Sequence, residues 1–206
     1  MAASRDLDVF YPIVPDVAWL KRLVPLGVRT VQLRLKDASA ATIGKEISEA
    51  IEVCKRYRCQ LIVNDYWREA LALGADYVHL GQEDLAAADV STIQGRGVRL
   101  GISTHDEQEL AIALAAKPAY VALGPVYETR LKVMKWSPQG LDRFTRWKRA
   151  IGTLPLVAIG GITPERAGHV ITAGADSVAV ITDFMTHADP ETRVGEWLRW
   201  AQAARE

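Results

Sequence analysis

Short apolar, strand-like runs alternate with helix-like segments along the whole chain, and this alternation limits the possible folds more than any other feature. Eight strands are predicted, at Phe10–Val14, Thr30–Lys36, Gln60–Asp65, Tyr77–Gly81, Arg99–Thr104, Tyr120–Gly124, Leu156–Gly161 and Ser177–Thr182. A strict β-α order favours parallel strands joined by right-handed helical crossovers. Eight such units in 206 residues predict one α/β domain over residues 1–206, a (β/α)8 TIM barrel.

Residues at the predicted helix ends agree with this order. Asp189-Pro190 and Thr163-Pro164 each combine a capping side chain with a proline at the first helical position. Three glycines stand where a helix ends in a left-handed residue before the next strand, namely Gly27, Gly74 and Gly174. An open doubly wound sheet is the alternative fold. Its first strand is usually followed by a glycine-rich loop, whereas Pro15-Asp16 follows here.

Composition and charge exclude several classes of protein. With 49% hydrophobic and 24% charged residues, the chain has the make-up of an ordinary globular protein. Its 25 basic and 25 acidic residues cancel, so no overall field attracts nucleic acid or an anionic membrane. No run approaches about 18 apolar residues and no apolar signal core begins the chain, so neither membrane insertion nor secretion is expected. Cys54 and Cys59 match neither a zinc nor a CxxC spacing, which suits a reducing cytoplasm.

Polar residues gather at the carboxyl ends of the predicted strands, which in a barrel form the rim of the active site. Strict alternation in the second strand places Gln32, Arg34 and Lys36 on one face, pointing into the barrel mouth. Cations there require an anionic partner, because a charge removed from water must be neutralised. Lys132, on the unusually long connection Pro125–Gln139, joins the same group. Together these side chains predict a site for phosphate oxygens.

An acidic pair, Asp65 and Asp84, follows the third and fourth strands. Two carboxylates without a cysteine or histidine cluster suit a hard cation, and Mg²⁺ fits best because it combines carboxylates with substrate phosphates. The alternative is that each aspartate caps the helix that follows it. A general acid–base dyad is less favoured, because nothing in the sequence would separate the two pKa values. Their joint position across the mouth from the cations favours the metal.

The last two strands end in residues typical of a phosphate site, Gly160-Gly161 and Ile181-Thr182. Backbone N–H groups of a Gly-Gly turn bind anions, and this is where (β/α)8 enzymes commonly hold phosphate. The alternative is that the two glycines only form a tight turn. Among the histidines, His79 lies inside a strand and is interpreted as a buried residue with satisfied hydrogen bonds, whereas His105 could line the site.

Five segments of the chain resemble the thiamine phosphate synthase family, in the family's order and at its spacing. They are Gln32–Lys36, Asn64–Arg68, His79–Leu85, Gly101–His105 and Ala158–Ile162. The resemblance implies a barrel enzyme that joins hydroxymethylpyrimidine pyrophosphate to thiazole phosphate and releases thiamine phosphate and pyrophosphate. The reaction would be a dissociative substitution, in which pyrophosphate leaves before the thiazole nitrogen attacks. It requires no protein nucleophile, and the sequence offers no convincing one.

The resemblance also implies a role for each site residue. The pyrimidine pyrophosphate would be held by Gln32, Arg34, Lys36, Asn64, Ser103 and Lys132. Four of these would act in catalysis, namely Arg34, Lys36, Ser103 and Lys132. Mg²⁺ is the implied cofactor, with Asp65 and Asp84 as its ligands. The thiazole phosphate would be held by Thr129, Gly161, Ile181 and Thr182.

Two departures from the family pattern fall on the thiazole side. The family loop usually reads Thr-x-Thr-Lys, whereas this chain has Thr129–Lys132 with Leu131 in place of the second hydroxyl, and Thr182 stands where serine is usual. A related thiazole tautomerase is one alternative, but it carries a histidine after the glycine of the sixth strand, where this chain has Pro125. A non-catalytic barrel that binds thiamine intermediates is the other. Retention of both aspartates and all three cations argues against it.

The expected partners are therefore two small-molecule substrates, with neither nucleic acid nor a membrane among them. Cytoplasmic location follows from the lack of a signal segment and from the cysteine usage. The sequence leaves the oligomeric state open, a homo-oligomer included.

Overall fold

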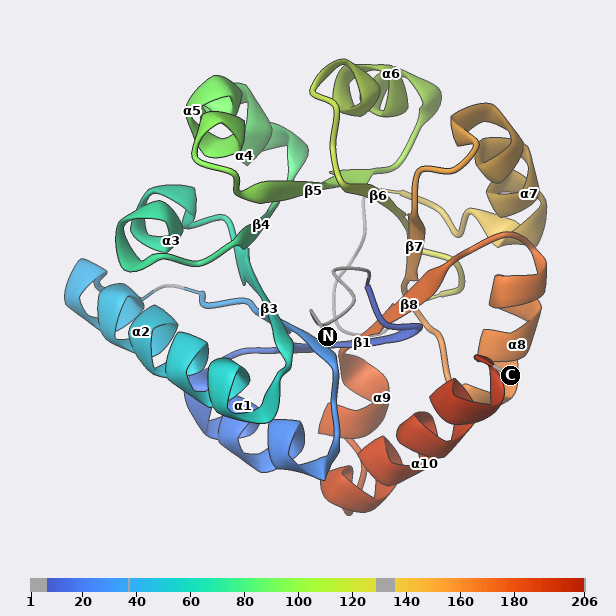
Figure 1. The fold of residues 1–206 in the computed structure, drawn as a ribbon. Helices are drawn as coiled ribbons and strands as arrows, with labels where there is room; N and C mark the ends of the chain where they lie inside the picture. Colours follow the sequence, from blue (N-terminus) through green and yellow to red (C-terminus); the bar gives the residue numbers. More distant parts are fainter. Residues whose placement is uncertain (1–6, 37, 129–135, 206) are drawn as a thin grey trace.

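The eight predicted strands are present and close into a barrel (Figure 1). The computed structural model describes residues 7–36, 38–128 and 136–205. Its strands are β1 (Phe10–Val14), β2 (Thr30–Leu33), β3 (Gln60–Asn64), β4 (Tyr77–Leu80), β5 (Arg99–Thr104), β6 (Tyr120–Leu123), β7 (Leu156–Ile159) and β8 (Ser177–Val180). Each strand pairs in parallel with the next, and β8 returns to β1, where Phe10 lies opposite Val178. The prediction of a (β/α)8 TIM barrel is confirmed.

Helices surround the ring of strands, as Figure 1 shows in a view into the barrel. They are α1 (Val17–Leu23), α2 (Ala40–Tyr57), α3 (Trp67–Leu73), α4 (Gln82–Ala87), α5 (Val90–Gly95), α6 (Glu107–Ala115), α7 (Gly140–Ile151), α8 (Pro164–Thr172), α9 (Thr182–Met185) and α10 (Pro190–Ala203), with a short 3-10 helix η1 (Val24–Leu26). None of the helices in the described part of the chain is both long and apolar enough to cross a membrane.

The strands separate two cores of different character. Outward-facing side chains such as Phe10, Val31 and Leu33 pack with the helices in one large apolar cluster. The barrel interior holds a smaller cluster, which is rich in tyrosine and consists of Tyr11, Ile13, Ile62, Tyr77, Tyr120, Ala122, Val157 and Ala179. Because side chains alternate across a strand, Gln32, between Val31 and Leu33, points into the interior. The predicted inward direction is therefore confirmed for Gln32, whereas Arg34 and Lys36, predicted on the same face, lie beyond the end of β2.

Several strands end earlier than predicted, and the backbone explains why. β2 ends at Leu33 instead of Lys36, although the N–H of Arg34 still donates to the carbonyl of Val14 at 2.8 Å. β7 ends at Ile159 because Gly160 and Gly161 have φ values of 105° and 66°, which an extended strand cannot contain. The polar residues that follow the strands therefore lie in the loops that form the rim.

The predicted helix ends are largely as expected. The side chain of Asp189 accepts a hydrogen bond from the N–H of Thr192 at the start of α10, as an N-cap should. Thr163 occupies the N-cap position of α8, but its side chain makes no capping hydrogen bond. The three helix-ending glycines are left-handed, with φ of 110° at Gly27, 80° at Gly74 and 116° at Gly174.

Candidate active site

The carboxylate pair lies on the rim beside β3 and β4. Asp65 directly follows β3, is half-buried, and has a left-handed φ of 64°, a conformation that aspartate and asparagine tolerate better than most residues. Its N–H donates to the carbonyl of His79 in β4 at 2.9 Å, which fixes the turn. Asp84 belongs to the first turn of α4, and its carboxylate leans back over the end of β4, 3.6 Å from where a side chain on Gly81 would begin.

Neither aspartate caps a helix. The N-cap of α3 is Tyr66 and the N-cap of α4 is Gly81, so the capping alternative for Asp65 and Asp84 is wrong. Instead the two carboxyl groups face each other. Burial, followed by repulsion from the Asp84 carboxylate and by a hydrogen bond that the pair can share, raises the pKa of Asp65 to about 6.

The predicted cations are placed unequally. Arg34 is half-buried just beyond β2, and its positive charge acts on the neighbouring β3 and β4, where it partly offsets the raised pKa of Asp65 and adds to the lowering of the pKa of His79. Lys36 is exposed to solvent, two residues further along. Thr129 and Lys132, together with Arg130 and Leu131, lie outside the described residues.

The three uncharged residues predicted for the pyrimidine side are already hydrogen-bonded within the protein. Gln32 is buried, and its Nε2 donates to the Tyr11 hydroxyl at 2.6 Å. Asn64, the last residue of β3, donates from Nδ2 to the carboxylate of Asp65 and so orients it. Ser103, in β5, has its Oγ 2.8 Å from Nε2 of His79. The structure thus places Asn64 and Asp65 at the end of β3 and Ser103 near the end of β5, on either side of β4, with Gln32 deeper in the barrel.

The residues predicted to hold the thiazole phosphate, Gly161, Ile181 and Thr182, lie on the opposite side of the rim, after β7 and β8. The turn after β7 packs closely on the β6–α7 connection, because the carbonyl of Gly160 accepts from the N–H of Tyr127 at 3.1 Å. A side chain on Gly161 would start only 2.6 Å from the carbonyl oxygen of Glu128, so glycine is required there. Ile181 and Thr182 follow β8, and Thr182 begins α9.

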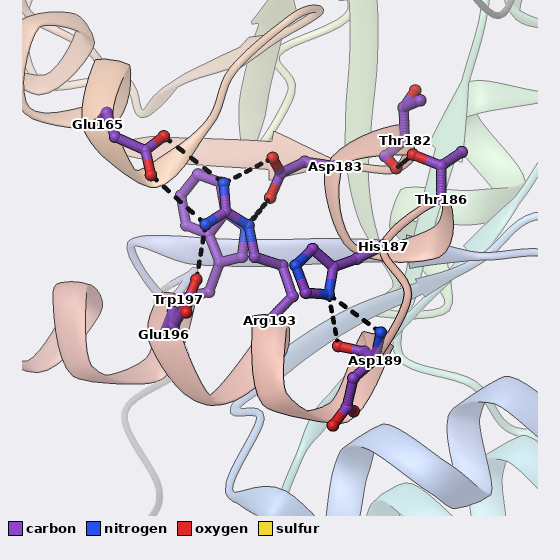
Figure 2. A network of polar contacts seen from close by, with 9 residues as sticks. All are labelled: Glu165, Thr182, Asp183, Thr186, His187, Asp189, Arg193, Glu196 and Trp197. Carbon is purple, nitrogen blue, oxygen red and sulfur yellow. Dashed lines mark hydrogen bonds and ion pairs between the residues drawn. The ribbon is translucent and has the colours of Figure 1, made fainter.

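A polar network holds α9 in place (Figure 2). Arg193 of α10 donates to both carboxylate oxygens of Asp183, at 2.8 and 2.9 Å, and also pairs with Glu196 at 2.6 Å. The indole N–H of Trp197 donates to Asp183 at 2.8 Å, and the indole ring stacks on Phe10 of β1. This network ties the turn that contains Thr182 to the barrel wall.

The two histidines of interest have partners. His79 is buried between Tyr120, 2.7 Å from its Nδ1, and Ser103, which confirms its interpretation as a satisfied buried residue. Burial, helped by the charge of Arg34, lowers its pKa to about 3, so the ring is neutral. His105 is held by Glu109 at 2.8 Å and stacks on Trp136, so its imidazole is oriented by α6 and by the segment before α7.

Three residues of the candidate site were not found in the sequence. Gln82 donates to the carbonyl of Ser103 at 2.6 Å and fixes the end of β5. Tyr11 and Tyr120 lie under the rim, with their hydroxyls 2.9 Å apart. Alternation along a strand indicates which side chains point into the barrel, but it does not show that these two hydroxyls meet, because 109 residues separate them.

A closed parallel barrel that carries its charged residues at the carboxyl ends of the strands is a (β/α)8 enzyme fold. The family model described as thiamine monophosphate synthase matches residues 10–184. The chain is 56% identical over 192 residues to the thiamine-phosphate synthase of Rhizobium etli, covering 93% of this chain and 94% of that protein. The thiamine-phosphate synthase of Yersinia pestis is 49% identical over 179 residues, covering 87% and 83%. The chain therefore belongs to the thiamine monophosphate synthase family, as its motifs indicated, and is a transferase of thiamine biosynthesis.

The fold is also shared with a solved structure. Thiamine phosphate pyrophosphorylase from Pyrococcus furiosus superimposes with a TM-score of 0.82 at 24% identity, covering 94% of this chain and 95% of that one. At this identity the likeness shows the barrel alone. It agrees with the closed β1–β8 order.

Proposed function

We propose that the chain condenses hydroxymethylpyrimidine pyrophosphate with thiazole phosphate, forming thiamine phosphate and releasing pyrophosphate. The observation that carries the proposal is the carboxylate pair on the rim. Burial and the facing carboxylate of Asp84 raise the cost of ionising Asp65, and a protein gains nothing in stability from such an arrangement. A site that binds a cation together with an anionic substrate accounts for it.

The donor set fits Mg²⁺. Asp65 and Asp84 supply hard oxygens, and the described residues contain no group of three or more His, Cys, Asp or Glu side chains that could enclose a metal alone. Mg²⁺ typically takes one or two carboxylates and fills its remaining positions with water and substrate phosphate oxygens. When bound, the ion would neutralise charge that develops on the leaving pyrophosphate. Metal and pyrophosphate are therefore expected to bind cooperatively.

Several side chains of the protein orient the leaving pyrophosphate and stabilise the negative charge that develops on it. Arg34 and Lys36 approach the pyrophosphate from the loop after β2, and Lys132, which lies outside the described residues, adds a third cation. Asn64 holds the Asp65 carboxylate in place, and Ser103 contacts the pyrimidine pyrophosphate from β5. Donors placed where charge develops lower the barrier to bond cleavage.

On the opposite side, Gly161, Ile181, Thr182 and Thr129 hold the thiazole phosphate. The left-handed Gly160-Gly161 turn and the network under Thr182 support this assignment, because both keep backbone groups in fixed positions. Binding of both substrates brings the thiazole nitrogen close to the pyrimidine methylene carbon. The electron pair of the broken C–O bond leaves with pyrophosphate, and the nitrogen lone pair forms the new C–N bond. No protein nucleophile takes part.

The proposal is tested by measuring thiamine phosphate formation with and without Mg²⁺, for the wild type and for Asp65→Asn. Asparagine tolerates the left-handed φ of 64° at this position, so the variant removes charge without adding backbone strain. We expect metal-dependent product from the wild type and a loss of at least about a hundredfold in the variant. Absence of product despite saturable binding of the pyrimidine pyrophosphate would support the non-catalytic barrel instead.

Curated relatives at 46–56% identity are named as synthases, which favours this activity over the thiazole tautomerase, and Pro125 occupies the position of the tautomerase histidine.

Location in the cytoplasm is supported by Cys54 and Cys59, both of which are buried and free. A homo-oligomer is tested by light scattering of the purified protein.

A further inference from the structure

A continuous hydrogen-bonded chain crosses the barrel interior and joins two residues of the proposed pyrimidine site. It runs from Gln32 Nε2 to the Tyr11 hydroxyl at 2.6 Å and on to the Tyr120 hydroxyl at 2.9 Å. From Tyr120 it continues to His79 Nδ1 at 2.7 Å, and from His79 Nε2 to Ser103 Oγ at 2.8 Å. All members except Ser103 are buried, so water does not compete for these groups.

With the Gln32 amide oriented as in the structure, counting protons gives the direction of every other bond in this chain. Gln32 donates through its amide, so the Tyr11 oxygen accepts, and the single Tyr11 proton goes to Tyr120. Tyr120 then has one proton left, which it donates to Nδ1 of His79. Burial raises the pKa values of both tyrosines, so each hydroxyl keeps its proton.

We propose that this chain fixes His79 as the tautomer protonated at Nε2, and that His79 in turn holds Ser103 as a hydrogen-bond donor toward the substrate. A neutral imidazole whose Nδ1 accepts must carry its proton on Nε2. That proton is donated to Ser103 Oγ. Because Oγ accepts from Nε2, the Ser103 proton has no acceptor within the chain and remains available for a substrate atom at the barrel mouth. Gln82, which donates to the backbone carbonyl of Ser103, holds this end of β5 in place.

The role of Ser103 becomes specific as a result. It donates to an acceptor atom of the pyrimidine pyrophosphate, a ring nitrogen or a phosphate oxygen, and cannot serve as a base. Tyr11, Tyr120 and His79 are positioning residues, since they act through Ser103 and Gln32. This assignment of roles rests on the proposed function, whereas the proton order in the ligand-free protein does not.

The opposite order is the one real competitor. If the Gln32 amide were turned over, its oxygen would accept from Tyr11 and every later bond would reverse. His79 would then be protonated at Nδ1, and the Ser103 hydroxyl would donate to Nε2 instead of to the substrate. The two orders differ in which imidazole nitrogen carries a proton, which is directly measurable.

The test is ¹⁵N NMR of the histidine-labelled, ligand-free protein, with His79 assigned by comparison with His79→Asn. We expect a protonated Nε2 and an unprotonated Nδ1, unchanged between about pH 5 and 8. In Tyr120→Phe the donor to Nδ1 is gone, and we expect the fixed tautomer to give way to a mixture. Protonation at Nδ1 in the wild type, or an unchanged tautomer in Tyr120→Phe, overturns the proposal.

Steady-state kinetics then tests the consequence. Tyr120→Phe should lower kcat/KM for the pyrimidine pyrophosphate about tenfold and leave the KM for thiazole phosphate within about twofold. Thr104→Val is the matched control, because Thr104 is an equally buried hydroxyl in the same strand as Ser103 and donates outside the chain, to the carbonyl of Ala122. Equal losses in both variants would contradict a role specific to the chain. If the wild type formed no product, the proposed function would fail while the NMR result still decided the proton order.

Discussion

Asp65 and Asp183 both follow strands of the same barrel, yet they are treated in opposite ways. Asp183 receives two hydrogen bonds from Arg193 and a third from Trp197, so the chain itself neutralises its charge (Figure 2). Asp65 faces a second carboxylate, Asp84, and among the described residues the amide of Asn64 and the charge of Arg34 favour its ionised form.

The difference separates a carboxylate that the chain neutralises from one that it leaves beside a like charge, on the same rim. Where the rim needs a rigid frame under Thr182, an arginine of the same chain completes the aspartate. Asp65 instead keeps an unfavourable neighbour, and in the proposed function a bound cation would relieve that repulsion.

Removal of the structural carboxylate should have the largest effect on stability. Asp183→Ala leaves the largely buried Arg193 and the Trp197 indole N–H without their main acceptor, so we expect a loss of about 3 kcal/mol in the free energy of unfolding. Urea denaturation measures it. Glu165→Gln is the control, because Glu165 is exposed and 3.4 Å from Arg193, and it should change stability by under about 0.5 kcal/mol. Similar losses in both variants would contradict the central role of Asp183.

Gly161→Ala should damage the phosphate side selectively. Its left-handed φ of 66° and the 2.6 Å approach of the Glu128 carbonyl force the turn to shift, at a cost of about 1–3 kcal/mol. We expect the KM for thiazole phosphate to rise about tenfold, with the KM for the pyrimidine pyrophosphate little changed.

Gly168→Ala is the matched control for this variant. Gly168 lies within α8, and nothing would lie within 4 Å of a new side chain there. We expect unchanged kinetics and a gain in stability of about 0.5–1 kcal/mol. Equal KM values in the Gly161 variant and the wild type would mean that this turn does not hold the thiazole phosphate.

Asp65→Asn should stabilise the ligand-free protein while it abolishes activity. The pKa of Asp65 is about 6 in the folded protein against an ordinary value of 3.8, so the folded state binds more protons between these values. The contribution of Asp65 to stability is present below about pH 4 and is lost as pH rises through about 6. Because Asp65 is half-exposed, we expect a gain of only about 1 kcal/mol in the variant at pH 7.5 and none at pH 3.5.

Thermal unfolding at both pH values measures this difference between variant and wild type. Titrating groups that do not contact Asp65 are common to both proteins and cancel. Glu83→Gln, an exposed neighbour in the same turn of α4, should show no such gain at either pH. A variant less stable than the wild type at pH 7.5 would mean that the carboxylate pair is not a source of strain.

Local patterns allowed much of the fold and part of the site to be predicted. The eight strands, the cap at Asp189 and the helix-ending glycines depend on a few consecutive residues. Asp65 and Asp84 could be paired because parallel strands bring their carboxyl ends to one edge.

What could not be predicted depends on contacts between distant segments. Tyr11 and Tyr120 are 109 residues apart, and no short-range pattern announces that their hydroxyls meet inside the barrel. The choice of Asp183 as the partner of Arg193 likewise depends on how α9 and α10 pack. Several strands were predicted to run too far, because the alternation of residues continues into the rim loops beyond the last residue of the regular strand.

The most direct test of the account is calorimetric binding of inorganic pyrophosphate, with and without Mg²⁺, to the wild type and to Asp65→Asn. If the carboxylate pair exists to hold a cation beside pyrophosphate, Mg²⁺ should tighten pyrophosphate binding to the wild type at least about tenfold and have little effect in the variant. Equal affinity with and without Mg²⁺, or the same enhancement in Asp65→Asn, would contradict the assignment of Asp65 and Asp84 as the metal site.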